Sequence, residues 1–192
     1  MRKIPTLFKR EFENHHVVRI TEAVTEGCEC VINGDCIPTI KWDGACCAII
    51  GGSLYKRYDA KKGKPIPEGA IKCQENADPI TGHLPCWVKC GWKNPADRWF
   101  VAAHHNRLVP LKDGTYEAIG KHFNGNPYHL ETDKLIRHGA DVISHNGELF
   151  TFGGIKQYLS EHEIEGIVFW KDGKPVCKIK RSDFGFEWNN RK

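Results

Sequence analysis

Short hydrophobic runs of strand length recur along the chain, separated by polar segments that are rich in glycine and proline. The runs lie at residues 45–50, 99–103, 115–119, 166–170 and 175–179. Apolar, β-branched and aromatic side chains fill them, which is typical of β-strands. The last two are joined by Lys171-Asp172-Gly173-Lys174, and an Asp-Gly pair between two such runs predicts a hairpin.

Helical periodicity is rarer than strand periodicity. Residues 154–162 place Ile155, Tyr158 and Leu159 at positions i, i+3 and i+4, which predicts one amphipathic helix. Glycine, proline and asparagine cluster in three places and predict irregular segments there, at residues 63–69, 76–85 and 124–127. We therefore predict an α+β fold in which antiparallel sheets dominate.

Composition limits the class of protein. The chain has 192 residues, of which 40% are hydrophobic and 27% charged, as in a globular protein that forms one domain. Nine cysteines occur without an export signal or a long apolar stretch after Met1. We therefore expect reduced thiols, a cytoplasmic location and no membrane partner. The net charge of +4 permits a nucleic-acid partner without requiring one.

The tetrad Lys41-Trp42-Asp43-Gly44 is the first candidate for chemistry. It follows Pro38 and precedes the run at 45–50, so we expect Lys41 to lie in a turn at the mouth of a strand. A lysine that is partly withdrawn from water can exist in part as a free amine, which is a nucleophile. Taken alone, a motif this short is better explained by a surface lysine beside a turn. The charged residues further along the chain are what favour chemistry at Lys41.

Two acids and two lysines occupy strand-like positions further along the chain. Glu117 lies within the run at 115–119, and Glu165 directly precedes the run at 166–170. Lys178 and Lys180 are two residues apart, so both point to one face of a strand. Two like charges on one face repel each other unless an anion lies between them. Each acid, taken singly, is also explained as an edge residue or a salt-bridge partner.

In this order, Lys-x-Asp-Gly, an arginine, a strand glutamate, Glu-Gly and Lys-x-Lys resemble the motifs of the covalent nucleotidyltransferases. This superfamily contains polynucleotide ligases and mRNA capping enzymes. Longer stretches resemble one branch of it, the small family of the vertebrate 5′-to-3′ RNA ligase. These stretches lie at residues 4–8, 41–47, 82–88, 117–120, 124–128, 138–140 and 165–168.

The resemblance implies a fold and a reaction. The fold is the ATP-grasp-like adenylation domain of DNA and RNA ligases, with antiparallel sheets flanked by helices, as a single domain over residues 1–192. Only residues 181–192 follow the Lys-x-Lys motif, too few for a C-terminal OB-fold. The implied reaction joins RNA ends that carry a 5′-phosphate and a 3′-hydroxyl, through a lysyl-AMP intermediate formed from ATP.

The resemblance also implies roles for individual residues. Lys41 would attack the α-phosphate of ATP, and Lys178 and Lys180 would grip that phosphate. Glu165 would help to bind a divalent metal, Mg²⁺ or alternatively Mn²⁺. Phosphoryl transfer needs such charge neutralisation and in-line positioning more than acid–base chemistry. Two further roles concern the nucleotide and the RNA end: Glu117 would hold a ribose hydroxyl, and Arg57 would contact the ribose and the incoming phosphate.

Basic residues outside the motifs are candidates for RNA binding, namely Lys56, Lys61, Lys62, Lys64 and Arg181. Tryptophans can stack on unpaired bases, although core or loop anchoring explains each of them as well: Trp87, Trp92 and Trp99. The same two readings, stacking on adenine or packing in the core, apply to Phe123, Phe150 and Phe152.

Other functions fit parts of the same sequence. Within enzymes, a DNA nick ligase or a GTP-using capping-type enzyme would share the motifs. A non-catalytic RNA-binding module would have no physical reason to keep Lys41, Glu117, Glu165 and Lys178 together. His83-x2-Cys86-x3-Cys90 has the spacing of zinc ligands but lacks an obvious fourth, and buried small residues explain these cysteines too.

Overall fold

The computed structural model describes residues 3–14, 16–79, 81–106 and 109–188. These residues form two compact units, each discontinuous in sequence. Unit 1 contains Asp43–His138 together with Lys3, and unit 2 contains Ile4–Trp42 and the residues from Gly139 onward. The chain passes between the units after Trp42 and again after His138. Units of this kind also occur inside single domains, so one domain over residues 1–192 stays a prediction.

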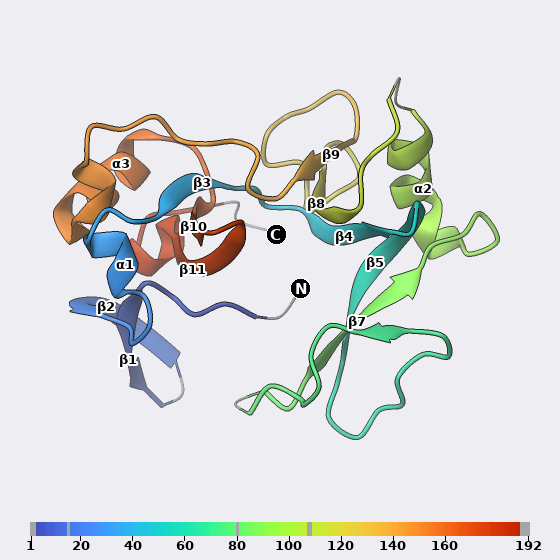
Figure 1. The fold of residues 1–192 in the computed structure, drawn as a ribbon, viewed down its shortest axis with the longest axis horizontal. Helices are drawn as coiled ribbons and strands as arrows, with labels where there is room; N and C mark the ends of the chain where they lie inside the picture. Colours follow the sequence, from blue (N-terminus) through green and yellow to red (C-terminus); the bar gives the residue numbers. More distant parts are fainter. Residues whose placement is uncertain (1–2, 15, 80, 107–108, 189–192) are drawn as a thin grey trace. The chain divides into compact units, whose positions relative to one another are not determined.

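Unit 1 is a sheet with short helices beside it. Its elements are β4 (Ala45–Ile50), β5 (Ser53–Ala60), β6 (Ile71–Lys72), β7 (Leu84–Lys89), η1 (Pro95–Asp97), α2 (Arg98–His105), β8 (Gly114–Ile119) and β9 (Lys134–Arg137). The six strands are antiparallel in the order β6-β7-β5-β4-β8-β9 (Figure 1). Cys47, Tyr116 and Ala118 form part of the core on one face of the sheet, together with Val101 of α2. Strand alternation therefore turns Cys46 and Glu117 to the opposite face.

Unit 2 contains two smaller sheets. Its elements are β1 (Phe8–Glu13), β2 (His16–Val24), α1 (Glu29–Ile32), β3 (Ile37–Lys41), η2 (Glu148–Phe150), α3 (Phe152–Glu161), β10 (Gly166–Lys171), β11 (Lys174–Lys180) and η3 (Arg181–Phe184). Strands β1 and β2 form a hairpin, and β11, β10 and β3 form an antiparallel sheet in that order. Ile155 and Leu159 of α3 are fully buried in one core with Ile167 and Ile179 of this sheet.

Most predicted elements are confirmed. Residues 45–50, 115–119, 166–170 and 175–179 are strands, residues 154–162 lie almost entirely in α3, and the class is α+β with antiparallel sheets. The predicted hairpin joins β10 to β11, where Lys171 pairs with Lys174. Asp172 and Gly173 both have positive φ, +50° and +70°, which is the type I′ geometry that Asp-Gly favours.

The strand predicted at residues 99–103 is wrong, because these residues belong to helix α2. Five apolar residues in a row do not distinguish a strand from a helix by their period. The preceding residues decide: the Asn94 side chain accepts a hydrogen bond from the Ala96 N–H, and Pro95 stands at the first helical position. Both are helix-start signals, and they turn the run into a helix with Val101 buried.

The expected place of Lys41 is also wrong. Lys41 is the last residue of strand β3, not a residue of a turn that opens β4, and β3 and β4 belong to different units. Pro38 makes this strand hard to recognise from the sequence, because proline has no backbone N–H to donate to a neighbouring strand. Strand β3 lies at the edge of its sheet, where proline is tolerated.

Two general properties follow from the described residues. All nine cysteines are free thiols. No helix in the described part of the chain is long and apolar enough to cross a membrane.

Candidate active site

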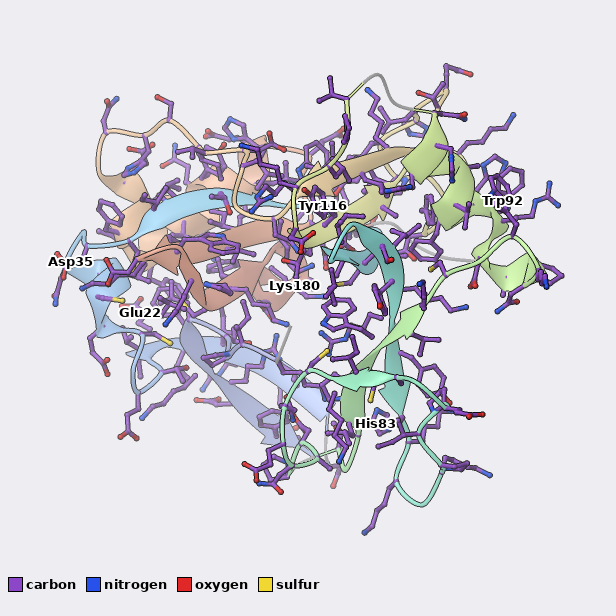
Figure 2. All side chains as sticks on the ribbon, turned by 45° about the vertical axis from the view of Figure 1, so that its right-hand side comes forward. Glu22, Asp35, His83, Trp92, Tyr116 and Lys180 are labelled. Atoms are coloured by element: carbon purple, nitrogen blue, oxygen red, sulfur yellow. The ribbon has the colours of Figure 1, made fainter. Side chains whose placement is uncertain are left out.

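Three of the sequence motifs meet at the start of strand β10 in unit 2. Gly166 is the first residue of β10 and pairs with Lys41 of β3 on one side and with Lys180 of β11 on the other. Glu165, which is buried, precedes it directly. Glu165 Oε2 accepts a hydrogen bond from Lys41 Nζ, and Glu165 Oε1 lies 2.7 Å from Lys180 Nζ. The strand register thus places one carboxylate between two lysines (Lys180 is labelled in Figure 2).

The glycines of two motifs are required by close backbone contacts. A Cβ atom on Gly166 would lie 2.2 Å from the Ile179 carbonyl oxygen. A Cβ atom on Gly44 in unit 1 would lie 2.2 Å from the Ala118 carbonyl oxygen. Neither distance leaves room for a side chain, so only glycine lets the backbone approach this closely.

Lys178 lies near the same carboxylate but forms no ion pair with it, because Glu165 pairs with Lys41 and Lys180. Its side chain shares a face of β11 with Lys180, as predicted, because Cys177 and Ile179 are buried on the other face. Among the described residues no carboxylate lies within ion-pairing distance of Lys178 Nζ. Burial, followed by the charges of Lys41 and Lys180, lowers the pKa of Lys178 to about 8. An anion bound here would relieve that repulsion.

An open pocket lies beside Lys178 and Lys180. It has a volume of about 470 Å³ and is lined by Lys178 and Lys180, by Ser182, Asp183 and Gly185 of the following segment, and by Arg10, Val17, Val18 and Arg19 of the β1–β2 hairpin. Arg10 donates two hydrogen bonds to Asp183 Oδ1. Four basic residues against one acid make this pocket electropositive, which suits phosphate groups.

Replacing Lys178 with methionine is expected to stabilise the ligand-free protein, most strongly at neutral pH. Below pH 8 the folded protein carries a charged lysine near Lys41, Lys180 and Arg10, with Glu165 as the compensating acid. Between pH 8 and about 10.4 the unfolded chain holds a proton that the folded chain has lost, so wild-type stability rises with pH. The advantage of Lys178→Met should therefore be on the order of 1–3 kcal/mol at pH 7 and shrink towards pH 10.

Urea unfolding at the two pH values measures this difference. Lys174→Met is the matched control, since Lys174 is exposed on the same strand, and it should show no such dependence on pH. A Lys178→Met protein that is less stable than wild type at pH 7 would contradict the lowered pKa.

The motif residues of unit 1 form a second group. Glu117 Oε1 accepts the Gly44 backbone N–H at 3.1 Å, and Glu117 Oε2 lies 2.9 Å from His138 Nε2. Asp43 is buried and accepts a hydrogen bond from Asn124 Nδ2 at 2.8 Å, while its own backbone N–H donates to Tyr128 Oη at 2.7 Å. The predicted turn at residues 124–127, together with the following Tyr128, thus fixes Asp43 and Gly44.

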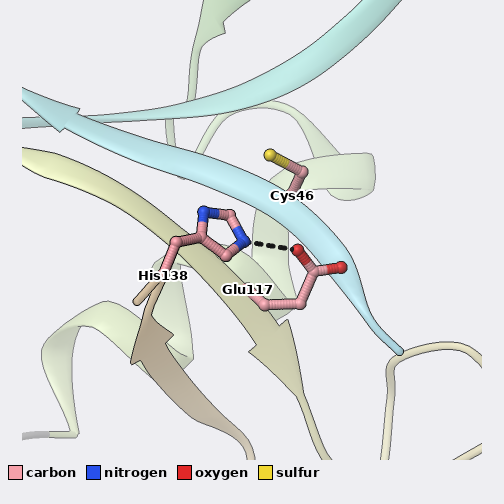
Figure 3. A group of neighbouring side chains, drawn as sticks. All are labelled: Cys46, Glu117 and His138. Carbon is pink, nitrogen blue, oxygen red and sulfur yellow. Dashed lines mark hydrogen bonds and ion pairs between the residues drawn. The ribbon is translucent and has the colours of Figure 1, made fainter. Parts of the chain in front are cut away.

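Sequence reasoning assigned no role to several of these partners. His138 lies in one of the stretches that carried the family resemblance, but its position after β9 gave no hint that it reaches Glu117. Cys46 is paired with Glu117 across β4 and β8, and its thiol belongs to the same group of side chains (Figure 3). The preference of Asn-Gly-Asn-Pro for turns was visible, whereas the contact of Asn124 with Asp43 depends on folding.

The basic residues predicted to contact RNA fall into two groups, exposed lysines and side chains that already form ion pairs. Lys61, Lys62 and Lys64 are exposed in the loop after β5, where a phosphate backbone can reach them. Lys56 instead forms an ion pair with Asp97, which is buried. Arg57 lies on the same strand, and its Nε atom donates to Asp59 Oδ1 at 3.0 Å.

Arg181 has a structural task in unit 2. Its guanidinium donates to the carbonyl oxygens of Leu159 and His162, at the C-terminal end of α3, and to that of Glu187. Arginine at a helix C-terminus satisfies free carbonyl groups and opposes the helix dipole. An RNA contact by Arg181 stays a prediction.

The aromatic residues considered for base stacking are either packed in the protein interior or exposed. Phe123 and Trp87 are buried, and Phe150 and Phe152 pack against the core of unit 2. Core packing therefore explains these four. Trp99 stacks on His122 with ring centroids 3.4 Å apart. Trp92 is 64% exposed and is the tryptophan best placed for a base to stack on (Figure 2).

The zinc alternative at His83, Cys86 and Cys90 gains no support in the described part of the chain. Cys86 is fully buried in β7. The cluster of potential metal ligands found among the described residues is a different one, Cys46, Glu117 and His138.

Comparison with known proteins gives one consistent result. A family model described as RNA ligase 1 matches residues 101–192. The chain is similar to RNA ligase 1 of Pongo abelii, with 29% identity over 79% of this chain and 68% of that protein. It is also similar to RNA ligase 1 of Rattus norvegicus, with 26% identity over 97% of this chain and 82% of the relative. RNA ligase 1 of Danio rerio is 29% identical over 59% of this chain and 45% of its own length.

Proposed function

Because the chain is related to the RNA ligase 1 family, as its motif series predicted, we propose that it is an ATP-dependent RNA ligase. It joins a 5′-phosphate to a 3′-hydroxyl by self-adenylation, transfer of AMP to the 5′-phosphate, and attack of the 3′-hydroxyl with release of AMP. The proposal includes the ATP-grasp-like adenylation fold of ligases. The observation that carries it is the convergence of Lys41 and Lys180 on the buried carboxylate of Glu165.

In the first step Lys41 is the nucleophile. Its ammonium group leaves the ion pair with Glu165 and gives a proton to solvent. The free amine then attacks the α-phosphorus of ATP, so that an Nζ–P bond forms while the P–O bond to pyrophosphate breaks, and the attacking nitrogen gives its second proton to solvent. Lysine is suited to this task because its ammonium group can lose a proton, unlike a guanidinium.

The other charged residues neutralise the phosphate groups. Lys178 and Lys180 lie on one face of β11. In the proposed reaction they hold the α-phosphate, which supplies the anion that Lys178 lacks in the ligand-free protein. Preorganised positive charge of this kind is worth several kcal/mol where water is excluded. In unit 1, we assign Glu117 to a ribose hydroxyl and Arg57 to the ribose and the incoming 5′-phosphate.

Glu165 fits a divalent metal by its chemistry. Carboxylate oxygens are the ligands that Mg²⁺ prefers, and one or two carboxylates with substrate phosphates form a usual set; Mn²⁺ accepts the same oxygens. When bound, the ion neutralises the charge that develops on the transferred phosphate. Both oxygens of Glu165 face lysines in the ligand-free protein, so a metal at Glu165 would also release Lys41 for attack.

The proposal is tested with the wild-type protein and two nucleotides. Incubation with α-labelled ATP and magnesium should leave label on the protein after denaturation, whereas α-labelled GTP should not. Label from GTP alone would move the activity to a capping-type transfer. Label from neither nucleotide would leave a non-catalytic RNA-binding module. Ligation of 5′-phosphorylated RNA, compared with DNA of the same sequence, then separates an RNA ligase from a DNA nick ligase.

A further inference from the structure

Three side chains with metal-binding atoms meet on one face of the sheet in unit 1. The ligand atoms of Cys46, Glu117 and His138 all lie within 4.8 Å of one another. The side chains of Glu117 and His138 are only 13% and 17% exposed. Figure 3 shows the His138 ring directed at the Glu117 carboxylate, with Cys46 on the adjacent strand. A thiol, an imidazole and a carboxylate thus share one partly enclosed position.

The strand register produces this group. Cys46 of β4 is directly opposite Glu117 of β8, so their side chains share a face. The backbone N–H of His138 donates to the carbonyl oxygen of Thr115, two residues before Glu117, which places His138 next to the same face. The opposite face is occupied by the core residue Tyr116. Because the sheet fixes all of these positions, the group is built into unit 1.

The hydrogen bonds around the group resemble the support of a metal site. His138 Nδ1 lies 3.0 Å from Thr115 Oγ1, a hydroxyl that can donate to this nitrogen or accept from it. In the ligand-free protein Nε2–H donates to Glu117 Oε2, and a cation would replace that proton while Nδ1–H donates to Thr115. Glu117 Oε1 is held by the Gly44 N–H, which leaves Oε2 facing His138. A cation bound between the three side chains would offset the negative charge of Glu117 and replace the thiol proton of Cys46.

From this geometry we propose that Cys46, Glu117 and His138 bind a thiophilic divalent cation of the Zn²⁺ class. Cysteine sulfur, histidine nitrogen and carboxylate oxygen are the ligands of Zn²⁺, and three protein ligands leave one position open. Mg²⁺ and Ca²⁺ prefer sets made only of oxygen, so the site discriminates against the metal expected at Glu165. It is a second metal site, distinct in residues and in ligand chemistry.

A consequence follows that rests on the proposed function. If Glu117 holds the ribose of ATP, a cation at this site competes for the same carboxylate. Zn²⁺ should then slow self-adenylation even when magnesium is in large excess, because magnesium does not exchange for zinc at a thiolate.

Cobalt(II) is the probe for the site itself, because a thiolate bound to cobalt gives a charge-transfer absorption in the near ultraviolet. Metal-free protein titrated with Co²⁺ in the absence of nucleotide should develop this band with one equivalent, and Zn²⁺ should abolish it. Cys46→Ser should lose the band, and His138→Gln should weaken binding at least about tenfold. Two matched controls, Cys90→Ser in unit 1 and Cys30→Ser in unit 2, should keep it.

The outcomes separate the metal site from the ligase proposal. Lys41→Ala should bind cobalt like wild type while taking no label from ATP. A protein that binds cobalt but never takes label would keep the metal site and refute the ligase. Absence of the band, its survival in Cys46→Ser, or its loss in Cys90→Ser would overturn the metal site. Wild-type affinity in His138→Gln would overturn it as well, even if Cys46→Ser failed to fold.

Discussion

Lys41→Arg is expected to abolish the labelled protein adduct, with a loss of at least about 10⁴-fold in the rate of self-adenylation. Arginine keeps the positive charge and can keep the ion pair with Glu165, so the sheet around β3 should remain intact. Its guanidinium does not lose a proton at any working pH and is no nucleophile. The measurement is the amount of label from α-labelled ATP that survives denaturation, with magnesium present.

Two comparisons make this result specific. Lys171→Arg is the matched control, because Lys171 also forms an ion pair in unit 2, with Asp35, and should take label normally. Lys41→Arg supplied with a chemically adenylylated RNA should still seal it measurably, since the last step does not use the lysine amine. Label on Lys41→Arg at the wild-type rate would show that another residue is the nucleophile.

Local sequence correctly predicted those elements in which neighbouring residues all favour the same secondary structure. Asp172-Gly173 supplies the positive φ angles of a tight hairpin, and the apolar runs on either side supply its strands. The prediction failed where two signals compete. At residues 99–103 an apolar run opposed a helix start at Asn94-Pro95, and the cap prevailed. At Pro38 a proline opposed a strand, and the edge position resolved the conflict.

The candidate site shows the same limit at the level of contacts. The motif series named Lys41, Glu165 and Lys180, but only the register at Gly166 shows that one carboxylate lies between the two lysines. Cys46 and His138 are far apart in sequence and meet only because β4 and β9 both pair with β8. Charge patterning along the chain cannot reveal such partners, since cross-strand contacts depend on pairing.

Lys56 was predicted to contact RNA, but the structure suggests a role in stability instead. The Lys56→Met variant is expected to be less stable than the wild-type protein. Its Nζ pairs with the Asp97 carboxylate, and the Asp97 side chain is only 2% exposed. Asp97 also accepts the Gly91 backbone N–H, so it cannot turn to solvent without breaking that bond. Removing one partner of a buried ion pair leaves an uncompensated charge, and the free energy of unfolding should fall by about 3 kcal/mol.

Thermal and urea unfolding measure this loss, which corresponds to a drop in Tm on the order of 6–12 °C for a chain of this length. Lys61→Met, which changes an exposed lysine on the adjacent loop, should stay within about 0.5 kcal/mol of wild type. The double variant Lys56→Met, Asp97→Leu should recover part of the loss, because an apolar pair can replace a buried ion pair. RNA binding discriminates between the two roles. If Lys56→Met were as stable as wild type, and the slope of log RNA affinity against log salt concentration fell by about one, Lys56 would be a phosphate contact after all.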